Sequence, residues 1–279
     1  MTMKLLIRND LDSATLSASP ALVTTLPEAN LQRARGDAVA RSTSAADQTL
    51  DATWAAAVAV DAFCVWGHNL TADGTVRARL YTSDNWTGSP VYDSGAVAAL
   101  PAKPLGELSW GIDPLGTAWA MAGSTPHTVR WLDAVYVIRS ARFDLSDSGN
   151  PDGYLEAQRL YIGRAFTPTV NFDWGARLNY LDDSQFTRSE RGSLFVAAGP
   201  RYRKLNATLS WLSNAEVLRL GEDIGAVGKA GDLLVSLYPD DASLGRSLQY
   251  TLAARLDSLP EFVSSHLNAN TVTLTLQEI

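Results

Sequence analysis

The stretch that decides the fold class is Thr75-Val76-Arg77-Ala78-Arg79-Leu80-Tyr81. Its apolar side chains alternate with arginines, so Val76, Ala78 and Leu80 share one face of an extended chain. Turn-forming residues precede the stretch at Asp73-Gly74. This pattern predicts a β-strand with one buried and one solvated face.

Similar short runs recur along the chain and are bounded by Gly, Pro, Asn and Asp, while helical periodicity is nearly absent. The predicted strands of the first half also include 57–66, 134–145 and 154–162, and those of the second half are 170–178, 193–196, 202–211, 233–238, 248–256 and 271–276. Short strands separated by turn clusters are typical of antiparallel sandwiches and barrels. The predicted fold class is all-β, with two β-sandwich or jelly-roll-type units.

One short helix is expected in the C-terminal half, at about 213–224. Ser213 is followed three residues later by Glu216, which is the spacing of a capping box. Val217, Leu220 and Ile224 then recur at helical spacing.

The predicted domain organisation has three parts. Residues 1–44 are rich in Ala, Ser and Thr and are expected to form an extended N-terminal arm, because they offer too little apolar surface to fold alone. Residues 45–165 are expected to form one β-sandwich and residues 166–279 a second β-domain that contains the helix.

The composition and charge of the chain exclude some classes of partner. The chain has 279 residues, of which 46% are hydrophobic, and a net charge of −7. Such a chain is expected to fold, and it repels phosphate, so nucleic acid is not an expected partner. No apolar window of about 18 residues is present, which argues against membrane insertion, and the N-terminal apolar cluster is too short for a signal peptide. Synthesis and retention in a cytoplasm are therefore expected.

Catalytic signatures are absent from the sequence. It has no G-x-S-x-G, P-loop, G-x-G-x-x-G or H-E-x-x-H pattern. His68, His127 and His266 are far apart in the chain, and Cys64 lies in an apolar run that predicts burial. We therefore expect no enzymatic activity and no catalytic residue.

The predicted turn 147–153 is the short segment richest in Asp and Asn side-chain oxygens that could bind a metal ion. Asp147, Asn150 and Asp152 could together bind Ca²⁺, which takes oxygen ligands only. The same residues, with Pro151 and Gly153, also suit a plain β-turn, and this is the stronger interpretation. No other cofactor is expected.

Tryptophans are frequent, and three of them, Trp86, Trp110 and Trp119, fall in predicted loops. Aromatic rings beside polar residues can stack on a sugar ring. They are also typical anchors of protein interfaces, which is the interpretation we favour. Both alternatives remain open at this point.

Three segments carry a resemblance to a known family. Residues 60–71, 74–81 and 144–163 resemble the galactose-binding-like jelly roll of phage and prophage structural proteins. In the second half, residues 188–203, 212–216 and 237–241 are similar to distal-tail-type or minor tail proteins of long-tailed bacteriophages.

The resemblance implies a structural virion protein at the tail tip, made in the host bacterial cytoplasm. It implies a homo-oligomeric ring, a trimer or hexamer, that joins the tail tube to the receptor-binding apparatus, with other tail proteins (tube, hub, fibre) as partners. The alternative is a carbohydrate-binding module that attaches the particle to a cell-surface polysaccharide. For that alternative the candidate ligand residues are Trp86, Trp110, Trp119 and His127.

Overall fold

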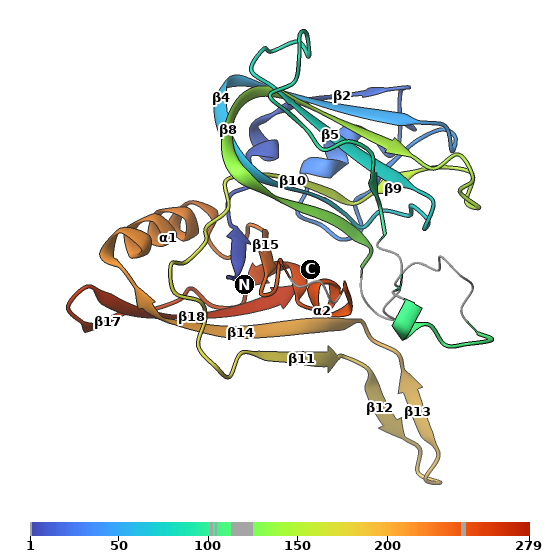
Figure 1. Cartoon of the computed structure of the whole chain (residues 1–279). Helices are drawn as coiled ribbons and strands as arrows, with labels where there is room; N and C mark the ends of the chain where they lie inside the picture. The colour runs from blue at the N-terminus through green and yellow to red at the C-terminus, as the bar shows by residue number, and fades with distance from the viewer. Residues whose placement is uncertain (1, 101–102, 104, 113–124, 241–243) are drawn as a thin grey trace.

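The computed structural model describes residues 2–100, 103, 105–112, 125–240 and 244–279. These described residues form two main antiparallel sheets with few short helices. One sheet builds the upper unit in Figure 1, and the other lies below it beside α1 (Asn214–Val227). The predicted all-β fold with β-sandwich units is confirmed.

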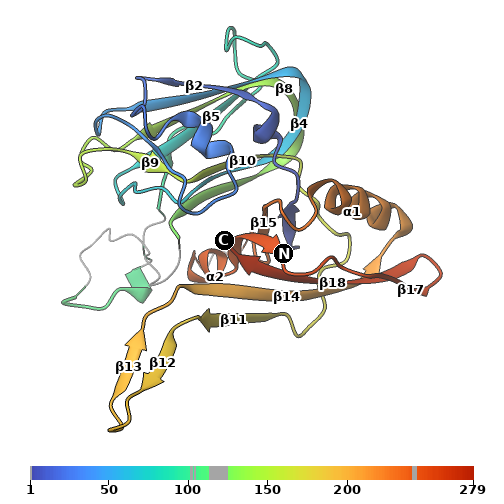
Figure 2. The ribbon, with the colours of Figure 1, turned by 180° about the vertical axis from the view of Figure 1, so that it is seen from behind.

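Two long strands organise the first sheet. It contains β2 (Thr15–Ser19), β4 (Gln48–Trp66), β5 (Thr75–Tyr81), β6 (Tyr92–Asp93), β7 (Val97–Ala98), β8 (His127–Ser146) and β10 (Arg159–Gly163). The register of β4 on β8 shifts between Thr53 and Val58 and again between Val60 and Ala62. Both strands bend sharply, so their two halves form opposite walls of one unit (Figures 1 and 2).

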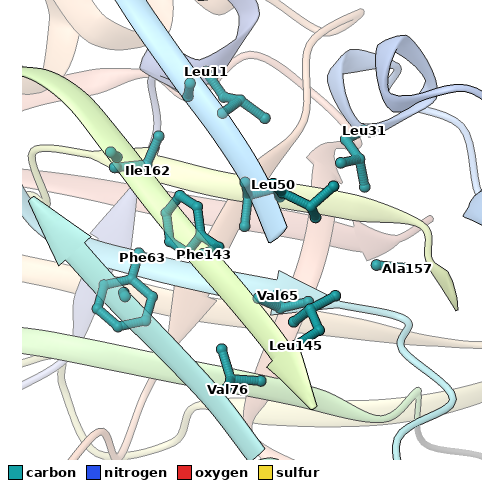
Figure 3. Packing of buried hydrophobic residues seen from close by; sticks show 14 of the residues in the cluster. Leu11, Leu31, Leu50, Phe63, Val65, Val76, Phe143, Leu145, Ala157 and Ile162 are labelled. Atoms are coloured by element: carbon teal, nitrogen blue, oxygen red, sulfur yellow. The ribbon is translucent and has the colours of Figure 1, made fainter. Parts of the chain in front are cut away.

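The space between these walls is filled by apolar side chains (Figure 3). Val76, Ala78 and Leu80 of β5 are almost fully buried there, as their alternation with arginines predicts. Phe63 from one wall meets Phe143 from the other edge to face, with ring centroids 5.8 Å apart. The bend of the long strands therefore creates the core of the unit.

The second sheet has the order β1-β15-β16-β18-β14-β11, and β17 pairs with β18. Its strands are β1 (Lys4–Leu6), β11 (Arg177–Asp182), β14 (Arg201–Leu212), β15 (Leu233–Ser236), β16 (Thr251–Leu256), β17 (Phe262–His266) and β18 (Ala269–Glu278). The remaining short elements are β3 (Ala40–Arg41), β9 (Glu156–Ala157), β12 (Gln185–Arg188), β13 (Leu194–Ala197), α2 (Leu244–Gln249), and the 3-10 turns η1 (Asp10–Ser13), η2 (Glu28–Gln32) and η3 (Leu105–Glu107).

Helix α1 begins where the sequence predicts. Ser213 caps it. The Ser213 hydroxyl oxygen accepts a hydrogen bond from the Glu216 amide, and the Glu216 carboxylate accepts one from the Ser213 amide. Leu220 and Ile224 are buried against one face of the second sheet. The helix continues to Val227, and Gly228 follows with a positive φ of 61°.

Residues 1–44 are packed along both units of the chain. Strand β1 pairs with β15 in the second sheet, β2 pairs with β4 in the first, and Leu11 and Leu31 are buried in the first core. The first unit is therefore inserted between β1 and the rest of the second sheet. The apolar residues of this segment pack against distant parts of the chain, and the segment alone does not identify those partners.

Strand alternation also explains how the two units join. Phe63 and Val65 of β4 point into the first core, so Cys64 and Trp66 point the opposite way. There they pack with Leu6, Leu234 and Ala253 of the second sheet. Cys64 is fully buried in this junction, as predicted, and burial raises the pKa of its thiol.

Among the described residues, no helix has both the length and the apolar character needed to cross a membrane.

Candidate interaction sites

A projecting β-hairpin is the most prominent surface feature of the second half. Among the described strands, β12 and β13 pair only with each other, and Figures 1 and 2 show them extending beyond the main sheet. Phe186 lies opposite Val196, and Arg188 lies opposite Leu194. Since directly opposed residues share a face, these four side chains form one surface, which we call the apolar hairpin face.

The base of the hairpin depends on a glycine. A Cβ on Gly199 would lie 2.4 Å from the carbonyl carbon of Asp183, so only glycine allows this close approach of the two chains. Asp182 accepts hydrogen bonds from the Ser184 amide and from Nε of Arg201, both at 2.8 Å. These hydrogen bonds lower the pKa of Asp182 to about 2, and those from Ser184 have the largest effect.

The apolar hairpin face is open to solvent. Phe186, Leu194 and Val196 are 67%, 50% and 56% exposed. A two-stranded hairpin is marginally stable in water unless its apolar side chains pack against something, and neighbouring exposed apolar side chains mark interaction surfaces. This face is therefore a candidate protein-binding surface.

A groove lies beside β17, and we call it the β17 groove. Its cavity volume is about 400 Å³, and its lining includes Leu259, Pro260, Glu261, Val263, Thr271 and Thr273. Leu259 and Val263 are more than half exposed. The groove thus combines an apolar strip with hydroxyl groups and one carboxylate.

The hairpin was not predicted from the sequence as an exposed surface. The run Leu194-Phe195-Val196-Ala197 is continuously apolar, and such a run predicts a buried strand. The available signal was its neighbour Ser189-Glu190-Arg191-Gly192, a charged tight turn in which Gly192 has a positive φ of 85°. A charged turn next to an apolar run is compatible with a projecting hairpin.

The four candidate sugar-binding residues are not brought together by the described structure. Trp110 is 90% exposed on the chain after η3. Trp86 is half-buried, and the guanidinium carbon of Arg142 lies 5.3 Å from its ring centroid. Trp119 lies outside the described residues.

His127 is almost fully buried, and it contributes to the lining of a pocket of about 210 Å³ beside Thr128 and Ser247. Its ring stacks on Trp66 with centroids 4.6 Å apart, and its Nδ1 lies 2.9 Å from the Thr125 carbonyl, to which it donates. It begins β8, whereas Arg142, the neighbour of Trp86, lies near the end of that strand. Trp86 therefore lies beside the half of β8 that pairs with β5, whereas His127 lies in the half that pairs with the C-terminal part of β4.

The oxygens proposed for calcium accept hydrogen bonds from groups within the turn and from Asn69 and Thr71. Asp147 accepts from the Thr71 amide at 2.7 Å and from Nδ2 of Asn150 at 3.2 Å. Asn150 Oδ1 accepts from the Asp152 amide at 3.0 Å, and Asp152 accepts from Asn69 at 3.0 Å. This network favours the plain-turn interpretation. Within the described part of the chain, no group of three or more His, Cys, Asp or Glu side chains is placed to hold a metal ion.

Comparison with known families and curated proteins gave no match. Among solved structures, the chain is similar to chitosan-binding module 1 of a chitosanase/glucanase from Paenibacillus sp. IK-5, at 9% identity and a TM-score of 0.38, covering 56% of this chain and 99% of that chain. It is also similar to the family 32 carbohydrate-binding module of C. perfringens NanJ in complex with galactose, at 11% identity and a TM-score of 0.39, covering 57% of this chain and 98% of that chain. A Streptococcus pneumoniae fucose-binding module aligns at 10% identity and a TM-score of 0.37, covering 56% of this chain and 95% of that chain.

Proposed function

We propose that this protein is a non-enzymatic structural component that assembles with copies of itself through the apolar hairpin face. One observation carries the proposal: a hairpin separate from the main sheets exposes Phe186, Leu194 and Val196 together. Burying such side chains on a partner is favourable at roughly 1.5 to 3 kcal/mol for each one that becomes fully buried. The hairpin would gain its stability in the assembly.

The rest of the molecule suits a rigid subunit. Both units share a packed apolar junction, and a buried ion pair crosses it. A rigid subunit with one projecting contact element can repeat a single contact from copy to copy. The setting we propose is the tail tip of a bacteriophage, which the sequence resemblance implies.

Light scattering on the purified protein tests self-assembly. We expect the wild type to form a discrete oligomer and Phe186→Asp to shift it to monomer, because a carboxylate cannot be buried unpaired in an apolar contact. The matched control is Thr187→Asp, which places the same charge on the opposite face of the same strand. A monomeric wild type at all concentrations overturns the proposal.

Glycan binding by the first unit is a second candidate. The observation that favours it is the fully accessible indole of Trp110, which could stack on a sugar ring. The similar solved structures are modules that bind chitosan, galactose or fucose, and these ligands define the first compounds to screen.

Titration calorimetry with chitosan oligomers, galactose and fucose tests this candidate. We expect binding that Trp110→Ala abolishes. The control is Trp174→Ala, which removes an equally exposed indole that lies outside the first unit. Equal binding by both variants would exclude Trp110 as the ligand platform.

A further inference from the structure

The apolar hairpin face and the β17 groove lie at opposite ends of the second sheet. Figures 1 and 2, which view the molecule from opposite sides, both show β12–β13 at one end and β17 at the other. A hairpin therefore cannot reach the groove of its own chain. A hairpin that docks in this groove must therefore come from another molecule.

The two surfaces are chemically complementary. The hairpin face contributes three exposed apolar side chains, and the groove contributes the exposed Leu259 and Val263. Each surface can therefore cover the apolar area that the other leaves in solvent.

Their charges are also opposite. The hairpin segment 184–199 has two arginines, Arg188 and Arg191, and one carboxylate, Glu190. The segment 258–268 contains Glu261 and neither lysine nor arginine. Arg188 lies on the same face as Phe186 and Val196, so it accompanies the apolar contact.

We propose that the apolar hairpin face of one copy docks in the β17 groove of the next copy, with Arg188 paired to Glu261. This inference rests on the proposed function and names the receiving surface. Two different surfaces meet in this contact, so the association is heterologous, and such contacts close into a ring or extend into a filament.

Crosslinking between two singly substituted chains tests the contact. A Val196→Cys chain is mixed with a tagged, larger Val263→Cys chain and treated with a short bis-maleimide. Cys64 is the only native cysteine and is fully buried, so it contributes no background. We expect a mixed crosslinked dimer. The matched control replaces the second chain with Val137→Cys, an equally exposed valine on β8 in the first unit, and should give none.

A charge exchange provides a second measurement. Arg188→Glu and Glu261→Lys should each weaken self-association about tenfold, and the double variant should restore it. Light scattering on the same samples distinguishes a wrong docking site from an absence of self-assembly. An oligomer without the mixed crosslink and without restoration overturns the docking site but leaves self-assembly intact. A monomer overturns both.

Discussion

Arg159 and Asp232 form a paired hydrogen-bonded contact across the junction of the two units, with Nε to Oδ2 at 2.9 Å and Nη2 to Oδ1 at 2.8 Å. The other N–H groups of Arg159 bind Asp12 and the Leu31 carbonyl. Burial opposes the charge, but the hydrogen bonds to Asp12 and Asp232 raise the pKa of Arg159. Arg159 therefore stays charged and fixes β10 to the start of β15.

Replacing Asp232 with Ala should destabilise the protein by about 3 kcal/mol, because it leaves a buried guanidinium partly unpaired. The hydroxyl of Tyr161, which donates to Asp232 at 2.7 Å, would lose its partner as well. Urea unfolding followed by tryptophan fluorescence measures the change. Asp37→Ala, which breaks the exposed pair with Arg35, is the control and should cost far less stability, because solvent screens an exposed ion pair. Equal losses would contradict a structural role for the junction pair.

Gly163→Ala should also destabilise the protein, by about 1 to 3 kcal/mol. A Cβ at this position would lie 2.8 Å from the Arg8 carbonyl oxygen, at the point where the chain returns from the first unit to the second sheet. Thermal unfolding measures the effect. Gly149→Ala, where a Cβ meets nothing within 4 Å, is the control and should be close to neutral. A neutral Gly163→Ala would show that the two chain segments can move apart at low cost.

The local elements of the fold were predictable because their signals are local. Strand β5 follows from the alternation around Val76, and α1 follows from the pairing of Ser213 with Glu216. The insertion of the first unit was not predictable, because Leu5 pairs with Val235 across most of the chain. Nothing in the neighbourhood of Leu5 identifies that distant partner.

The candidate surfaces were less predictable than the fold. The order of residues does not show whether an apolar run such as Leu194 to Ala197 is buried or projects, since both cases have the same composition. Trp110, which was predicted to lie in a loop, lies in a turn with its side chain exposed. His127 was proposed as a sugar-binding residue, yet at the start of β8 its ring is stacked on the ring of Trp66.

Adding Ca²⁺ or a chelator should leave the unfolding temperature unchanged within about 1 °C, because the proposed ligands already serve as hydrogen-bond acceptors for protein donors. Asp147→Ala should instead lower stability by about 1 to 3 kcal/mol, since the partly buried Thr71 amide would lose its acceptor. Differential scanning calorimetry measures both. A rise in the unfolding temperature with millimolar Ca²⁺ that Asp147→Ala abolishes would establish the calcium site instead.

Stability should fall as the pH drops from about 6.5 toward 4, because two histidines are buried in the neutral form. Burial is the main cause that lowers the pKa of His68 to about 3 and that of His127 to about 4. In the unfolded chain a histidine titrates near 6.5. Between these values the unfolded state binds protons that the folded state does not, so the free energy of unfolding decreases with falling pH.

The hydrogen bonds are consistent with this neutral state. Thr128 Oγ1 donates to the Ala99 carbonyl, so it accepts from Nε2 of His68, and Nδ1 of His68 is buried without a partner among the described residues. Each histidine should contribute a slope of up to about 1.4 kcal/mol per pH unit. Urea unfolding at pH 7.0, 6.0 and 5.0 measures the slope, and His68→Gln should reduce it whatever its effect on absolute stability. An unchanged slope in His68→Gln would mean that His68 becomes protonated in the folded protein as readily as in the unfolded chain.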